Sequence, residues 1–93
     1  MDTVTSPATT ITVAVRYFAA ARAAAGVESE KVQLRADATV EAALAALREQ
    51  HDPEFARVLD RCSFLLDEVA VRDRSTPLGP DATLDVLPPF AGG

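Results

Sequence analysis

The sequence predicts an α+β fold in which a mixed sheet of four to five strands packs against one main helix. Two observations lead to this prediction: apolar residues alternate with period two in several short segments, and one longer segment has the period of an amphipathic helix. Strands and helices do not alternate strictly along the chain, which favours α+β over a doubly wound parallel sheet. With 93 residues, the chain is expected to form one domain.

The strand segments place their apolar side chains on one face, as half-buried strands require. In the first of them, Ile11, Val13, Val15 and Tyr17 share that face. The second repeats the alternation, so the two are expected to be neighbours, and Asp67 with Glu68 is expected to form a turn. The expected strands are residues 11–17, 31–35, 62–66, 69–71 and 84–87.

The helix segments are marked by capping residues. Residues 19–25 are rich in alanine and end at Gly26, a favourable residue after a helix C-terminus. The main helix follows Thr39, an expected N-cap. A second helical piece has Asp52 as its cap and Pro53 at its first position. The apolar stripe of the main helix consists of Val40, Ala43, Leu44 and Leu47.

The charge balance excludes several classes of partner. Lys and Arg number 9 against 14 Asp and Glu, which gives a net charge of −5. Binding to nucleic acid or to an anionic membrane surface needs clustered basic residues, so neither is expected. No segment has the length of a membrane-spanning helix or the pattern of a signal peptide, so we expect a cytoplasmic protein with a basic protein partner.

The chain is poor in residues that catalyse reactions or bind metals. Cys62 is the single cysteine and His51 the single histidine, so neither an intramolecular disulfide nor a metal site is expected. Cys62 is interpreted as a small buried hydrophobe and His51 as part of a solvated helix end. The arginines are interpreted as a solvated surface.

The C-terminal segment carries the strongest functional signal. Pro88 and Pro89 cannot donate the hydrogen bonds of a strand, so the last strand ends there and the chain is expected to leave as a stiff, extended stub. Gly92 and Gly93 lack Cβ atoms and can enter a narrow slot. The reactive group is then the α-carboxylate of Gly93, activated by an ATP-dependent partner and converted to a thiocarboxylate by a sulfur donor.

The sequence resembles the MoaD/ThiS family of ubiquitin-like sulfur carriers, most closely the MoaD members. The order of several short motifs and the ending Pro-Pro-Phe-Ala-Gly-Gly carry the resemblance, which covers nearly the whole chain after Thr10. The family often has an Asn-Gly turn where this chain has Asp67 and Glu68. The matching segments are residues 13–19, Gly26, 38–44, 77–78 and 85–93.

The resemblance implies a β-grasp (ubiquitin-like) fold and a carrier that is not an enzyme alone. Together with the composition of the two ends, this predicts a flexible leader over residues 1–10, a β-grasp domain over 11–87 and an extended Gly-Gly tail over 88–93. The resemblance also implies adenylation of Gly93 by a MoeB-like E1 enzyme that uses ATP, with a sulfurtransferase as the sulfur source and no cofactor or metal on the carrier itself.

The same resemblance implies a partner for the tail. The segment of Pro88, Pro89, Phe90, Ala91 and Gly92 would enter a MoaE-like large subunit of molybdopterin synthase, in a heterotetramer, and pass sulfur to precursor Z. Sulfur transfer for thiamine or cysteine biosynthesis, a ubiquitin-like interaction module whose tail only docks, and a ubiquitin-type modifier are the alternatives.

Two aromatic residues have two interpretations each. Phe90 either packs back on its own sheet or anchors the tail in a partner, because aromatic residues are favoured at binding hot spots. Phe18 ends the first strand and is either a core residue or part of the interface.

Overall fold

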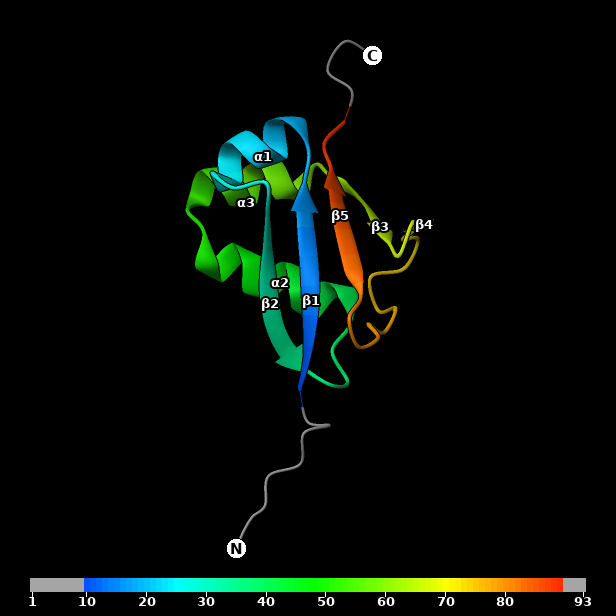
Figure 1. Cartoon of the computed structure of the whole chain (residues 1–93). Coiled ribbons are helices and arrows are strands. Elements are labelled where there is room, and N and C mark those ends of the chain that lie inside the picture. Colours follow the sequence, from blue (N-terminus) through cyan, green and yellow to red (C-terminus); the bar gives the residue numbers. More distant parts are fainter. Residues whose placement is uncertain (1–9, 90–93) are drawn as a thin grey trace, which may run out of the picture.

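The computed structural model describes residues 10–89 and contains a five-stranded mixed sheet, with two helices on one face and a third at the end of the sheet (Figure 1). The strands lie in the order β2-β1-β5-β3-β4. The strands are β1 (Thr10–Tyr17), β2 (Ser29–Arg35), β3 (Ser63–Leu66), β4 (Val69–Ala70) and β5 (Thr83–Leu87). The helices are α1 (Ala19–Ala25), α2 (Val40–Gln50) and α3 (Pro53–Asp60).

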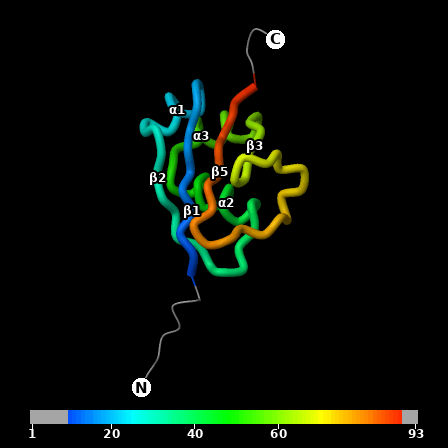
Figure 2. Tube along the Cα trace, turned by 45° about the vertical axis from the view of Figure 1, so that its right-hand side comes forward, coloured from blue at the N-terminus to red at the C-terminus, as the bar shows by residue number. Residues whose placement is uncertain are grey.

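The predicted fold class is confirmed, with more helical cover than one main helix. The central strands β1 and β5 are parallel, whereas β1 with β2, β3 with β5 and β3 with β4 are antiparallel. Helices α2 and α3 lie behind the sheet, and α1 lies at the end where β1 stops (Figures 1 and 2). The loop over residues 71–82 returns the chain from the β4 edge to β5 in the centre (Figure 2).

The core forms between the sheet and the helices, where the period-two and helical patterns meet. The inward residues of β1 and β5 pack against the apolar stripes of α2 and α3. Because these side chains all point to one side, the alternate residues of the strands lie on the other face, which no helix of residues 10–89 covers. The fully buried large side chains are Phe55, Leu44, Leu47, Leu59, Leu84, Val13, Val15, Val40 and Val86.

The helix ends follow the capping signals. The Oγ1 atom of Thr39 accepts a hydrogen bond from the amide of Ala42, and the carboxylate of Asp52 accepts one from the amide of Phe55 at 3.0 Å. Gly26 ends α1 in the left-handed conformation, with φ of 81°. The predicted caps of all three helices are therefore confirmed.

His51 corrects one prediction. Its side chain is only 15% exposed rather than solvated, and its Nε2 atom lies 2.6 Å from Glu30 Oε2. The hydroxyl of Tyr17 donates to the same Glu30 oxygen, and the imidazole lies against the ring of Phe55. The Glu30 carboxylate on β2 therefore connects the end of β1 with the end of α2. These contacts bring together segments that lie far apart in the sequence.

The turn between β3 and β4 contains backbone strain. Asp67 and Glu68 have φ of 48° and 72°, the left-handed pair of conformations that tight hairpins favour. Asp tolerates this region, and the Asp67 carboxylate accepts a hydrogen bond from the Thr83 amide. Glu68 occupies a position for which glycine is preferred, since its Cβ crowds the backbone there.

Replacing the strained residue is expected to stabilise the fold. Glu68→Gly should raise the free energy of unfolding by about 0.5–1 kcal/mol, because relief of left-handed strain exceeds the added entropy of the unfolded chain. Urea denaturation measures the change. The charge-matched control Glu49→Gly, in the exposed face of α2, should lower stability by about 0.5 kcal/mol. Equal effects of the two substitutions would contradict the strain.

Candidate partner-binding site at the root of the C-terminal tail

The root of the tail lies at the end of β5. Leu87 is the last residue of this strand, and its flanking strands β1 and β3 reach the same end of the sheet. Pro88 is half-buried and Pro89 is exposed. Phe90, Ala91, Gly92 and Gly93, which carry the predicted reactive group and partner contacts, lie outside the described residues, as do residues 1–9 of the predicted leader.

A groove of about 550 Å³ opens at this root, and apolar residues form most of its lining. Helix α1 contributes two alanines, whose small side chains leave room for an incoming group. The turn into α1 begins with Ala19 at φ of 51°, in the left-handed region. The groove is lined by Phe18, Ala19, Ala20, Ser63, Leu87, Pro88 and Pro89.

Phe18 is part of this groove and not of the core. Its neighbour Tyr17 points into the core and is 3% exposed, whereas Phe18 is 40% exposed. The amide of Phe18 donates to the carbonyl oxygen of Val86, which holds the residue beside the last turn of β5. A large apolar side chain is therefore presented to solvent directly beside Pro88 and Pro89, as a partner contact would require.

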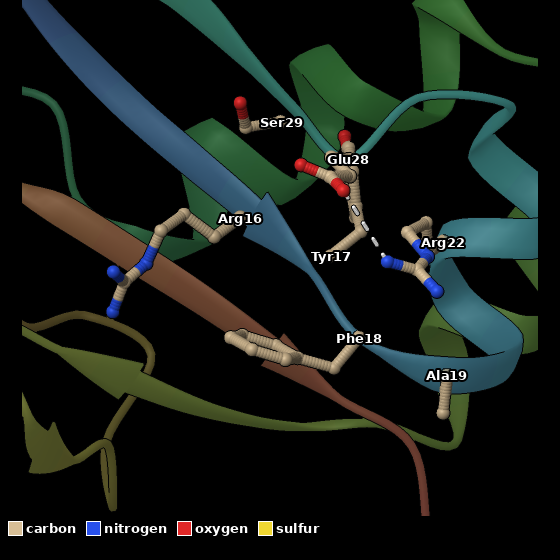
Figure 3. Close-up of a pocket in the computed structure, with 7 residues that line it drawn as sticks. All are labelled: Arg16, Tyr17, Phe18, Ala19, Arg22, Glu28 and Ser29. Carbon is tan, nitrogen blue, oxygen red and sulfur yellow. Dashed lines mark hydrogen bonds and ion pairs between the residues drawn. The ribbon is translucent and has the colours of Figure 1, made fainter.

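Two arginines flank Phe18. Figure 3 shows Arg16 and Arg22 on opposite sides of the aromatic ring, around a second pocket of about 430 Å³. Arg22 lies 3.5 Å from the Glu28 carboxylate in an exposed ion pair. Exposed ion pairs of this kind contribute little to stability, so Glu28 holds the guanidinium of Arg22 only weakly. The guanidinium is therefore available at the surface for contact with a partner.

Arg16 makes a different kind of pair. Its Nε and Nη2 atoms donate to the two oxygens of Asp85 at 2.6 and 2.8 Å. The Asp85 side chain is 6% exposed and that of Arg16 is 49% exposed. The hydrogen bond to Asp85 and the charges of Asp85 and Glu68 raise the pKa of Arg16.

Sequence reasoning missed this pair because it interpreted the arginines as a solvated surface. The available signal was an aspartate in the middle of the apolar strand β5. A carboxylate at such a position needs a partner, and the parallel register of β1 with β5 supplies Arg16 directly opposite. The register itself could not be read from the sequence.

Cys62 takes no part in the groove. It is buried, and burial raises the pKa of its thiol from the ordinary value. Its Sγ atom lies 3.2 Å from the carbonyl oxygen of Val58. Within residues 10–89, no three His, Cys, Asp or Glu side chains gather as a metal site would need.

The comparisons with known proteins place the chain in a family and a fold. A model of the ThiS family matches residues 15–93. SAMP1 of Haloferax volcanii has a similar structure, with a TM-score of 0.78 and 27% identity over 88% of this chain and 99% of that chain. No curated protein sequence matches this chain.

Two further solved structures share the fold. A molybdopterin converting factor subunit 1 of Pyrococcus furiosus, described there as putative, has a TM-score of 0.77 at 24% identity over 86% of this chain and 99% of its own. A complex of subunits 1 and 2 of the Helicobacter pylori molybdopterin-converting factor matches with a TM-score of 0.62 at 24% identity, over 89% of this chain and 100% of that one. Among the helices of residues 10–89, none has the length and hydropathy to cross a membrane.

The exposure of Phe18 predicts a small effect on stability. Phe18→Ala should lower the free energy of unfolding by only about 1–2 kcal/mol, since 40% of Phe18 is already exposed. The matched control Phe55→Ala, at a fully buried position, should cost about 3–5 kcal/mol. Denaturant titration of both variants measures the difference. A comparable loss in the two variants would place Phe18 in the core.

The burial of Cys62 predicts slow thiol chemistry. In the native protein the thiol should react with an alkylating reagent at least about a hundredfold more slowly than in denaturant, because it is buried and its pKa is raised. Intact mass against time measures the two rates. Similar rates would indicate an accessible thiol that takes part in sulfur relay.

Proposed function

The chain belongs to the ThiS family, and on that premise we propose that it is a sulfur carrier protein whose reactive group is the carboxylate of Gly93. The observation that carries the proposal is the position of the Gly92–Gly93 pair. Gly92 and Gly93 are the third and fourth residues after Pro89, at the root of the tail of a ubiquitin-like domain. The match to the family model includes both glycines. The described side chains offer no alternative reactive centre, since Cys62 is buried.

The proposed chemistry takes place on the tail while partners supply the catalysis. The Gly93 carboxylate attacks the α-phosphorus of ATP in an E1-like enzyme, and pyrophosphate leaves to give an acyl adenylate. Hydrosulfide then attacks the carbonyl carbon, a carbon–sulfur bond forms and AMP leaves with the electron pair. The product is a thiocarboxylate, a soft nucleophile that can deliver its sulfur to an acceptor.

The groove at the root of the tail is the proposed docking surface of these partners. Four residues follow Pro89, so Gly93 reaches at most about 14 Å beyond it. A partner whose active centre receives Gly93 must therefore approach Phe18, Leu87 and Pro88 closely. Burial of the exposed Phe18 ring and of Pro89 would supply apolar area for the contact.

Molybdopterin synthesis is the proposed pathway. The similarity to the subunit 1 structures supports it, and one of these is a complex with a subunit 2. In this proposal a MoaE-like large subunit receives the tail in a heterotetramer, and precursor Z accepts the sulfur. A MoeB-like E1 enzyme and a sulfurtransferase act before that step, in the cytoplasm. Carriers of thiamine and cysteine biosynthesis use the same chemistry and are separated by the identity of the large partner.

A protein modifier is the second candidate, because SAMP1 is 27% identical and shares the fold. A related structure names that protein as a small archaeal modifier. The adenylate of Gly93 would then be attacked by a lysine amine, and an isopeptide bond would form with release of AMP. Lys31 is the only lysine of this chain, so attachment of one copy to another through a lysine side chain would have to use it.

Conversion of the tail tests the sulfur-carrier function. After incubation with the cognate E1-like enzyme, ATP and sulfide, the intact mass should rise by about 16 Da, the difference between sulfur and oxygen. Deletion of Gly93 should abolish the rise without a change in the unfolding midpoint, since the tail lies beyond β5.

An alanine added after Gly93 is the second control. A carrier with this extension should bind its partner and remain unconverted, whereas a module that only docks should keep its full function. An unchanged mass of the wild-type chain, with an enzyme that is active on its own carrier, would overturn the sulfur-carrier function. Isopeptide adducts without a thiocarboxylate would favour the modifier.

A further inference from the structure

The ion pair of Arg16 and Asp85 lies on the helix-free face of the sheet, next to the groove. The two residues stand opposite each other in the register of β1 and β5. The guanidinium carbon of Arg16 lies 6.0 Å from the centre of the Phe18 ring. A partner that covers Phe18 and the root of the tail therefore meets Arg16 as well.

Arg16 retains hydrogen-bonding capacity that Asp85 does not use. A guanidinium has five N–H donors, and the bidentate pair occupies one on Nε and one on Nη2. Within residues 10–89 the side chain has hydrogen bonds to Asp85 alone, and it is 49% exposed. The two hydrogen bonds to Asp85 fix the plane of the guanidinium. The orientation of the remaining N–H donors, which face away from Asp85, is therefore fixed as well.

The charge around Arg16 indicates what kind of acceptor fits. Asp85 already neutralises the guanidinium, and the turn residues Asp67 and Glu68 line a pocket of about 240 Å³ together with Arg16 and Thr83. Carboxylates outnumber the cation here, so a further carboxylate would be repelled. A neutral oxygen, such as a backbone carbonyl, accepts a hydrogen bond without adding charge.

The fold itself does not require an ion pair at this place. A buried or half-buried pair gains little over two apolar residues of similar volume, whereas removal of one partner leaves an uncompensated charge. The neighbouring positions Leu65 and Leu87 on the same face are apolar, so leucines in place of Arg16 and Asp85 would fit their surroundings.

We propose that Arg16 is a specificity-determining contact for the enzyme that adenylates Gly93, and that it donates hydrogen bonds to an uncharged oxygen acceptor of that enzyme. Asp85 acts as the positioning residue, because its two hydrogen bonds hold the guanidinium of Arg16 in a fixed orientation. This inference rests on the proposed function, because an enzyme that adenylates Gly93 must bind the tail in its active site.

The experiment compares two double variants as substrates of the cognate E1-like enzyme, by release of pyrophosphate. In Arg16→Leu/Asp85→Leu the KM for the carrier should rise at least about tenfold while kcat changes less than about twofold, because the contact is remote from the reacting atoms. The matched control Arg35→Leu/Asp37→Leu removes an exposed pair at the other end of β2 and should leave KM within about twofold.

The measurement is repeated from low to high salt. The rise in KM of the first double variant should persist at about the same factor, since a hydrogen bond to a neutral acceptor is screened little. Unfolding midpoints of both double variants should stay within a few degrees of wild type. Arg16→Lys keeps the charge but loses the paired hydrogen bonds to Asp85. This variant should remain folded and provides a second test, with KM for the carrier raised several-fold.

Each outcome decides the inference. An unchanged KM in the leucine double variant and in Arg16→Lys would overturn it, as would a fall in kcat at constant KM. A rise in KM that disappears in high salt would mean a carboxylate acceptor and would overturn the neutral one. A wild-type chain that the enzyme does not adenylate would instead remove the proposed function, and the inference with it.

Discussion

The parallel pairing of β1 with β5 is the interaction on which the rest of the structure depends. It joins the first and last strands of residues 10–89 near the centre of the sheet, and its register sets Tyr17 beside Val86 and Arg16 beside Asp85. Inward, the pair forms the middle of the core; outward, it presents Phe18 and the ion pair next to the point where the tail leaves. A parallel pair needs a long connection, and residues 18–82, which contain all three helices and the strands β2, β3 and β4, provide it.

The two faces of the sheet therefore have different roles in the molecule. The helix side contains the apolar stripes, the capped helix ends and the Tyr17–Glu30–His51 contacts, which serve stability. The helix-free side holds the Arg16–Asp85 pair, and the groove with the exposed Phe18 ring lies at its edge, where α1 begins. The small size of the chain is consistent with such a division, because one modest core suffices to hold a stiff strand end in place for a partner.

Much of the fold was predictable because local signals and tertiary structure agree. The alternation in residues 11–17, the caps Thr39 and Asp52 and the turn at Asp67 and Glu68 are local features, and each appears where expected. The sequence did not predict the surroundings of His51 or the pairing of Arg16, since both depend on residues brought together over long separations. Phe18 follows the alternation of β1, but whether its face is covered depends on where the helices pack.

The same parallel pairing has a consequence for how the protein can be attached to other molecules. β1 has eight residues, so Thr10 lies about 25 Å from the end of β1, and β5 runs parallel to β1 toward that same end. The tail root is at the far end of that strand (Figure 1). A fluorophore or an affinity handle attached at Thr10 itself therefore sits away from the groove and leaves the C-terminal route to a partner open.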